Sequence, residues 1–157
     1  MLKKSFDPIV SENAHTLILG SLPGDQSILL NQYYAHPQNR FWKVLFTIFE
    51  EPLSNNYLVR KKLILDHQLA VWDVCASATR KGSMDHAILQ EVPNELEKLI
   101  VDKDIKQVFF NGQKAEKLHD KYFTRLPHVN YQSLPSTSPA NATYSFSKLC
   151  ESWKVIK

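Results

Sequence analysis

Four short apolar runs, separated by segments with helical spacing, restrict the fold of this chain more than any other feature. The runs are residues 16–19 (TLIL), 69–74 (LAVWDV), 106–110 (KQVFF) and a weaker one at 129–134 (VNYQSL). Apolar runs of this length are typical of buried strands. Strands that alternate with helices predict βαβ crossovers and a parallel sheet covered on both faces. We therefore expect a three-layer α/β/α sandwich around a central four-stranded, mostly parallel sheet.

The segments between the runs carry apolar residues three and four positions apart, as on one face of a helix. A helix over 96–100 is expected to start near Pro93, because proline is favoured in a helix's first turn. The apolar faces comprise Phe41, Trp42, Leu45, Phe46 and Phe49; Leu96, Leu99 and Ile100; Ala115, Leu118 and Tyr122; and Phe146, Leu149, Trp153 and Ile156.

All four glycines follow predicted strands, at what would be their carboxyl ends. Gly20 and Gly24 follow the first strand, Gly82 lies in the loop after the second, and Gly112 follows the third. The fourth strand runs into 134–140, LPSTSPA, with three hydroxyls and two prolines. Ligands of open α/β sheets bind along this edge, where glycine lets backbone N–H groups approach them closely. The sequence therefore predicts one functional rim.

Length and composition indicate one domain, residues 1–157, that is neither membrane-bound nor exported. Of its residues, 43% are hydrophobic and 22% charged, and no segment approaches the ~20 apolar residues that span a bilayer. MLKKSFDPIV lacks the apolar run of a secretory signal, so we expect a cytoplasmic protein, associated with the nucleoid through DNA, and a monomer. The net charge of +3 only mildly favours a polyanionic partner. Two cysteines are too few for an iron–sulfur cluster.

Three segments could carry chemistry. Residues 20–24, GSLPG, match neither a phosphate-binding Walker loop nor a dinucleotide fingerprint, and a tight turn would explain them equally well. Residues 136–140, STSPA, offer hydroxyl and backbone donors suited to phosphates, although Ser-Pro loops are common. In YYAHPQNRFWKVLF, 33–46, exposed aromatic rings beside the amide of Asn39 could stack on a base and orient water. Asn39 by itself would be read as a helix N-cap.

GSLPG, AHPQNRFWKVLF and LPSTSPA together resemble the motifs of the uracil-DNA glycosylase superfamily, most like its mismatch-specific and hypoxanthine-type branches. The resemblance implies a monofunctional DNA glycosylase of base excision repair, which flips a deaminated base out of DNA and hydrolyses its N-glycosidic bond without metal or cofactor. Hypoxanthine and uracil are the expected bases. The alternative is a catalytically inactive DNA- or nucleotide-binding member of the same fold. A hydrolase of free nucleosides is disfavoured, because no acidic cluster suited to calcium lies near the first strand.

Three positions differ from the family motifs, and these differences indicate which residue is the candidate catalytic residue. Leu22 stands where relatives have a water-activating Asn or Asp, Ser136 where they have Asn or His, and Ala140 where they insert a bulky leucine into the base stack. The hypoxanthine-type branch shares these losses, and its catalytic amide is assigned to the asparagine that aligns with Asn39. We therefore predict that Asn39 orients water, because an amide is a poor general base. Tyr34 aligns with the ring that stacks on the base.

The remaining expected contacts divide between base and DNA. Asp73 could accept an N–H from the base or be a buried structural carboxylate, and Asn111 could contact the base or cap a turn. The segment that comprises Arg80 and residues 81–83 fits either a phosphate-facing loop or an ordinary surface loop. With Ala140 small, filling the gap in the stack falls to Asn141 or to nothing, which predicts a preference for mismatches or single strands. The expected base contacts are Tyr34, Ser21, Leu22, Asp73 and Asn111, and the expected DNA contacts are Gly24, His36, Arg80, Ser136, Ser138, Pro139, Ala140 and Asn141.

Overall fold

The four predicted strands form the parallel centre of the main sheet. A computed structural model describes residues 1–81 and 87–157, so Gly82 and Ser83 of the predicted loop lie outside the described residues. The sheet has the order β2-β4-β3-β7-β8, and β4, β3, β7 and β8 run parallel. Their bounds are Thr16–Gly20 for β3, Leu69–Asp73 for β4, Gln107–Asn111 for β7 and Asn130–Leu134 for β8. The expected fold class is therefore confirmed, with one further strand.

That further strand, β2 (Ile9–Val10), pairs antiparallel with the edge of β4. Two residues are too few to show an alternating pattern, so no pattern in the chain predicted this strand. An antiparallel edge strand on a parallel sheet is a common arrangement.

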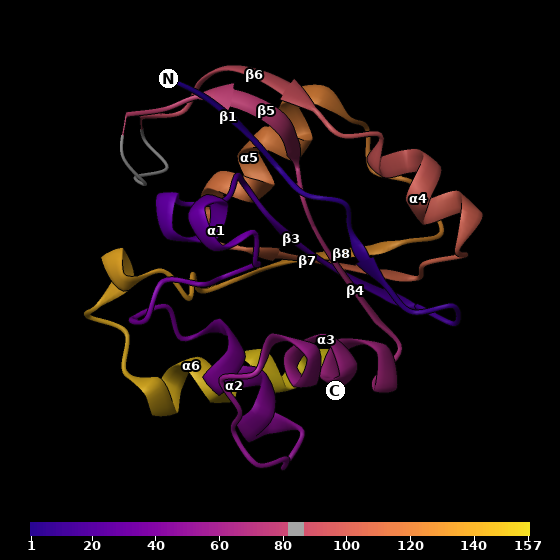
Figure 1. The fold of residues 1–157 in the computed structure, drawn as a ribbon. Coiled ribbons are helices and arrows are strands. Elements are labelled where there is room, and N and C mark those ends of the chain that lie inside the picture. The colour runs from indigo at the N-terminus through magenta and orange to yellow at the C-terminus, as the bar shows by residue number, and fades with distance from the viewer. Residues whose placement is uncertain (82–86) are drawn as a thin grey trace.

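Helices cover both faces of the sheet, as Figure 1 shows. On one face lie α2 (Phe41–Ile48), α3 (Tyr57–Asp66) and α6 (Phe146–Trp153), the last followed by the 3-10 helix η3 (Lys154–Ile156). On the other lie α1 (Asp25–Leu30), α4 (Leu96–Asp102) and α5 (Gln113–Tyr122). Of these, α1 and α3 had no predicted apolar face; α1 buries only Ser27, and α3 buries Leu63 and Ile64.

A second, smaller sheet lies over the face that carries α5, and the sequence did not reveal it. It contains β1 (Leu2–Lys4), β5 (Cys75–Thr79) and β6 (Leu89–Pro93) in the order β1-β5-β6, all antiparallel. Pro93 therefore ends a strand, and the expectation that it starts a helix is wrong, since α4 begins at Leu96. The β5–β6 pairing contains register shifts, and β6 is mostly exposed, so neither strand shows a clean period of two.

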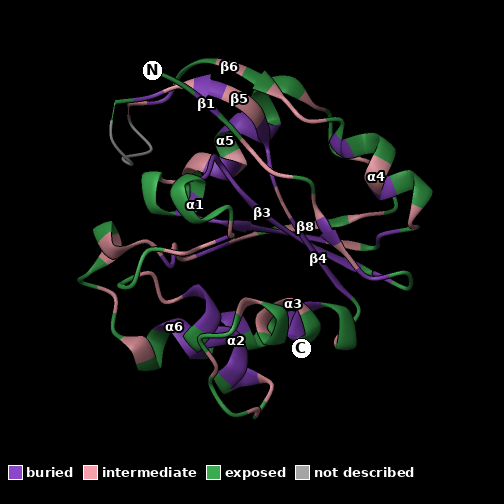
Figure 2. Ribbon diagram, viewed as in Figure 1, coloured by how far each residue is buried: buried purple, intermediate pink, exposed green. Residues whose placement is uncertain are grey.

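The two faces of the main sheet belong to two separate cores, because side chains alternate along each strand. Ile18 packs with α2, α3 and α6, whereas Leu17 and Leu19 pack with α4 and α5. Figure 2 shows the central strands buried, with exposed helix surfaces outside them. The second core continues past the carboxyl end of β4 into β5, through Val74, Cys75 and Ala78.

In the two described ranges, no helix has both the length and the apolar character needed to cross a bilayer.

Candidate active site

A cavity of about 1170 Å³ opens at the carboxyl ends of the parallel strands. The loops after β3, β7 and β8 line it, together with Asp73 at the end of β4 and the segment that precedes α2. Every predicted site residue except Arg80 is part of its lining. The fold thus brings the first two motifs, which are close in the sequence, together with the third, which lies nearly ninety residues further along the chain.

Asn39 lines the cavity just before α2, and it is not the N-cap that the sequence suggested, because Arg40 occupies the cap position. Its side-chain oxygen accepts a hydrogen bond from the N–H of Phe41, the first residue of α2, at 2.9 Å. The Asn39 N–H donates to the carbonyl of His36 at 2.9 Å, which fixes the turn around Pro37. A carboxamide oxygen can accept two hydrogen bonds, and the NH2 group can donate two. The bond to Phe41 therefore orients the amide without using all of its capacity.

Tyr34 forms an aromatic wall of the cavity, and its other face is covered. Its ring stacks on Phe41 with centroids 3.9 Å apart and planes 20° apart. Its backbone φ of 53° is left-handed, which costs an ordinary residue roughly 1–2 kcal/mol. A base in the cavity would meet the ring face opposite Phe41.

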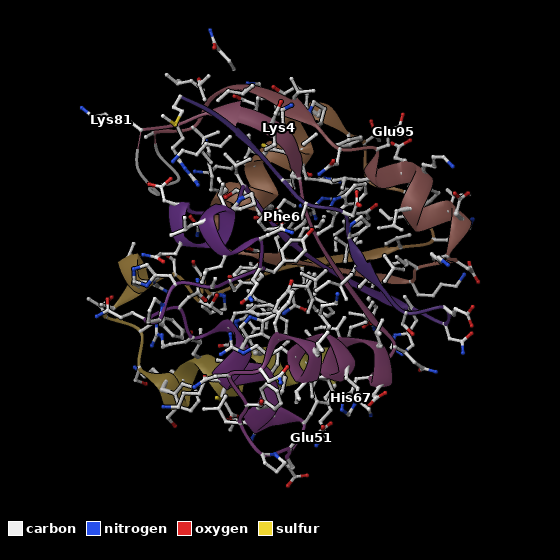
Figure 3. The ribbon with its side chains drawn as sticks, viewed as in Figure 1. Lys4, Phe6, Glu51, His67, Lys81 and Glu95 are labelled. Atoms are coloured by element: carbon white, nitrogen blue, oxygen red, sulfur yellow. The ribbon has the colours of Figure 1, made fainter. Side chains whose placement is uncertain are left out.

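Tyr33, by contrast, is part of the scaffold. It is buried, and its hydroxyl donates to the carbonyl of Asp7 at 3.0 Å and, more weakly, to that of Phe6 at 3.3 Å. The ring of Phe6, labelled near the middle of Figure 3, packs edge-on against Tyr33 with centroids 5.1 Å apart. Burial, and secondly the charge of Asp73, raise the pKa of the Tyr33 phenol far above its usual value.

Asp73 and Tyr34 meet at the floor of the cavity next to Gly20. A methyl group at Gly20 would lie 2.7 Å from Asp73 Oδ1 and 2.7 Å from the Tyr34 hydroxyl oxygen, so this position has room only for glycine. Asp73 is 3% exposed, and its Oδ2 accepts a hydrogen bond from the Ser5 hydroxyl at 2.8 Å. The carboxylate of Asp73 is therefore anchored to the scaffold at the floor of the cavity.

Asn111 is committed to the loop that follows β8. Its Nδ2 donates to the Thr137 hydroxyl at 2.9 Å, and its Oδ1 accepts from the Thr137 N–H at 2.9 Å. The side chain is 8% exposed and Thr137 is fully buried. The hypothesis that Asn111 reads the base is therefore not favoured by its placement, because both ends of the amide already hold the loop.

Hydroxyl turns within LPSTSPA shape the wall opposite Tyr34. The Ser136 hydroxyl accepts from the Ser138 N–H at 3.1 Å, and the Ser138 hydroxyl accepts from the Ala140 N–H at 3.2 Å, which caps the 3-10 helix η2 (Pro139–Asn141). Asn141 Nδ2 donates to the Ser136 carbonyl at 3.0 Å. A hydroxyl that accepts one hydrogen bond keeps its own O–H as a donor. The wall can therefore offer donors to a phosphate.

Arg40 joins the two walls, and the sequence analysis missed it. Its N–H donates to the carbonyl of Thr137 at 3.1 Å, and its guanidinium donates to the carbonyls of Asn141, at 3.0 Å, and Tyr144. Arg40 directly follows Asn39 within the His-Pro-x-Asn-Arg motif, so the resemblance could have flagged it. Its carbonyl partners lie about a hundred positions away, and no local pattern shows them.

Arg80 does not lie on the cavity, and the prediction that it contacts DNA needs correction. Its side chain is 2% exposed, and its guanidinium donates to the carbonyl of Pro23 in the GSLPG turn. A buried guanidinium held by a carbonyl of its own chain is not placed to meet a phosphate. Leu22, from the same turn, lines the cavity but has no polar side-chain atom with which to orient water.

Titration behaviour adds little chemistry to the site. Burial, followed by the charge of Asp73, raises the pKa of the Cys75 thiol to about 12, so this thiol stays neutral at physiological pH. Among the residues placed by the structure, no group of three or more His, Cys, Asp or Glu side chains is arranged to hold a metal ion.

The fold and cavity define an α/β protein whose ligand site lies at the carboxyl edge of a parallel sheet, with an amide, an aromatic wall and a hydroxyl loop facing one another. The family model of the uracil DNA glycosylase superfamily matches residues 8–157. The chain therefore belongs to the uracil DNA glycosylase superfamily, as its three motifs suggested.

Individual relatives agree with this assignment. The chain is 39% identical over 145 residues to a hypoxanthine DNA glycosylase from Methanosarcina barkeri, covering 90% of this chain and 89% of that protein. It is 35% identical over 161 residues to a hypoxanthine DNA glycosylase from Methanosarcina acetivorans, covering 99% and 98%. A solution NMR structure from Methanosarcina acetivorans, described as a provisional uracil DNA glycosylase, superposes with a TM-score of 0.82 at 33% identity, covering 99% and 97%.

Proposed function

We propose that this protein is a monofunctional DNA glycosylase that hydrolyses the N-glycosidic bond of a deaminated base, hypoxanthine or uracil, flipped out of DNA. One observation carries the proposal: the anchored carboxamide of Asn39 shares a single cavity with the ring of Tyr34 and the carboxylate of Asp73. Two relatives that are similar over most of the chain are hypoxanthine DNA glycosylases, which supports the reaction class.

The reaction requires positioning more than a nucleophilic side chain. The bond between C1′ and the base nitrogen breaks, its electron pair leaves with the base, and the sugar develops oxocarbenium character. A water oxygen then bonds to C1′, the water loses a proton, and the departing base gains one. Asn39 Oδ1, with one lone pair used by the Phe41 N–H, can accept a hydrogen bond from that water. Asn39 therefore orients the water rather than abstracting its proton.

Asp73 gives the cavity a preference for bases with a ring N–H. Hypoxanthine and uracil each carry an N–H next to a carbonyl, and an ionised carboxylate, which only accepts, can bind that N–H. Adenine presents a lone pair at the corresponding ring nitrogen, which would face Asp73 Oδ1 as one acceptor facing another. A site left with unpaired polar groups rejects such an analogue strongly.

The hydroxyl wall and the small side chain of Ala140 fit a substrate that is already poorly paired. Ser136 and Ser138 lie on the cavity wall and retain O–H donors for a phosphate, while Ala140 is too small to fill the gap left by a flipped base. Opening a well-stacked pair costs a few kcal/mol. We expect faster excision from mismatches and single strands than from matched duplexes, by a monomer that needs neither metal nor cofactor.

The test is an excision panel in which each oligonucleotide carries one hypoxanthine, uracil or xanthine, unpaired or opposite each partner, with EDTA present. The wild-type protein should release hypoxanthine or uracil, and the Asn39→Ala variant should lose at least a hundredfold in single-turnover rate while still binding DNA. Release by the variant at the wild-type rate would remove Asn39 from catalysis. DNA binding without release by the wild-type protein would establish the binding-only alternative, and release from free nucleosides would make the protein a nucleoside hydrolase.

Asn56→Ala is the matched control. Asn56 makes a matching bond at the start of α3, since its Oδ1 accepts from the N–H two residues on, that of Leu58, at 2.9 Å, but it does not line the cavity. Loss of either bond should destabilise the protein by about 0.5–2 kcal/mol. Only Asn39→Ala should also lower the single-turnover rate at least a hundredfold.

A further inference from the structure

The backbone of Tyr34 is held in a conformation that its side chain disfavours. Its φ of 53° lies in the left-handed region, where bulky residues are rare. The other non-glycine residues with positive φ in the described part of the chain are Asn31, Glu50, Gln68, Gln90 and Asp104. Among these positive-φ residues of the described chain, Tyr34 is the aromatic one, and it lines the cavity. Such a conformation persists only where the surroundings fix it, and it occurs preferentially at functional sites.

Hydrogen bonds fix the backbone from Tyr33 to Ala35: Trp42 and Ser27 hold the two peptide groups that flank Tyr34, and Tyr57 holds the peptide group before them. The Tyr33 N–H donates to the hydroxyl of Tyr57 at 3.1 Å, and the Tyr33 carbonyl accepts from Trp42 Nε1 at 2.8 Å. On the other side, the Ala35 N–H donates to the hydroxyl of Ser27 at 3.1 Å. The three side chains come from α3, α2 and α1, so each of three helices contributes one bond.

Ser27 is the point at which α1 meets this segment. It is the buried residue of α1, 5% exposed, and it lines the cavity. Its carbonyl accepts from the Gln32 N–H at 3.0 Å, which closes the end of the helix. Because α1 buries little else, the bond between the Ser27 hydroxyl and the Ala35 N–H is what links this helix to the aromatic wall.

We propose that Ser27 and Tyr57 are positioning residues that act through Tyr34, holding its ring between Phe41 and the flipped base. The inference deepens the proposed function and rests on it, because stacking requires a base in the cavity. Without either hydroxyl, the backbone around Tyr34 relaxes toward a common conformation and the ring leaves its stacked position on Phe41. Base capture then weakens while the DNA contacts of the rim remain.

The first test compares single variants in single-turnover excision of hypoxanthine. Ser27→Ala and Tyr57→Phe should each lower the rate at subsaturating enzyme about three- to tenfold, the effect of losing one hydrogen bond. Tyr131→Phe is the control for Tyr57→Phe, because the Tyr131 hydroxyl also accepts a backbone N–H at 3.1 Å, but from Leu126, far from the segment around Tyr34. Ser11→Ala, at a buried serine outside the cavity lining, is the control for Ser27→Ala. Unchanged rates in both test variants would overturn the inference.

The second test separates positioning from a general loss of structure. In a Tyr34→Ala background, Ser27→Ala should change the rate less than twofold, because the group through which it acts is gone. Affinity for DNA with an abasic site, which offers no base to stack on, should stay within twofold of wild type. Additive losses in the double variant, or weakened abasic binding, would overturn the inference. A wild-type protein that releases no base would instead overturn the proposed function.

Discussion

The two walls of the cavity are built in different ways. The wall made by residues 33–41 is tied to the interior, since Trp42, Tyr57 and Ser27 hold its backbone and Phe41 supports the ring of Tyr34. The wall made by residues 134–141 is stabilised internally by hydroxyl turns. Three side chains bond it to the rest of the protein: Asn111, Arg40 and Trp153. Of these, Trp153 Nε1 donates to the Pro135 carbonyl at 2.9 Å.

This difference separates two tasks. Positioning a water and a base needs sub-ångström precision, which a wall packed on the core can supply. Gripping a DNA backbone needs donors that adapt to a flexible polymer, which a loop of hydroxyl turns can supply. Changes to the first wall should therefore alter the chemical step, and changes to the second should alter DNA binding.

After Asn39→Ala, the largest effect should come from the floor beneath the first wall. Asp73→Asn replaces an acceptor-only group with one that also donates, so excision of hypoxanthine should fall about ten- to hundredfold and discrimination against adenine should narrow. Competition between hypoxanthine and adenine oligonucleotides measures both quantities. Asp66→Asn, which removes a carboxylate paired with Lys62 on the exposed face of α3, is the control and should change neither. An unchanged base preference in Asp73→Asn would give Asp73 a purely structural role.

The second wall should respond in stability and binding. Asn111→Ala leaves the Thr137 N–H buried without its acceptor, which should cost about 1–3 kcal/mol and lower Tm by several degrees. DNA affinity should fall while the single-turnover rate at saturating protein stays within about threefold of wild type. Calorimetry and a binding isotherm test this expectation. A rate loss without a binding loss would instead show that Asn111 contacts the base.

A smaller effect, in the opposite direction, should come from the tip of the second wall. Ala140 is exposed on η2, so a leucine there would not disturb the core. Ala140→Leu should raise excision from a matched duplex several-fold by filling the gap behind the flipped base, and it should leave single-strand excision unchanged. The ratio of the two rates is the measurement. An unchanged ratio would mean that this tip does not approach the base stack.

The last prediction is that a thiol reagent leaves the protein and its base release unchanged. Cys75 is fully buried, and burial raises its pKa to about 12; Cys150 is 8% exposed, and burial raises its pKa as well. Because the thiolate is the reactive form, neither cysteine should react with N-ethylmaleimide in the native protein between pH 7 and pH 9, and base release should persist. Mass spectrometry of the treated protein checks this. Rapid alkylation of Cys75 would show that the core around β5 opens in solution.

The sequence alone determined the parallel sheet, the rim and the motifs, because these depend on local patterns. Continuous apolar runs identify strands buried on both faces, and glycines after them mark the edge at which loops gather. The segment around Asn39 was recognisable for the same reason: its residues are consecutive. The structure places Asn39 on the cavity but gives the cap position of α2 to Arg40, so the catalytic role of Asn39 stays a prediction.

Only the tertiary structure decided what each polar group is used for. Arg80 is buried on the Pro23 carbonyl, Asn111 holds Thr137, and Arg40 joins the two walls, all through partners distant in sequence. The small antiparallel sheet and the left-handed Tyr34 arise in the same way. Hydrogen bonds between distant residues leave no periodicity in the chain, so whether a side chain serves the scaffold or the cavity is settled by which atoms the fold brings within reach.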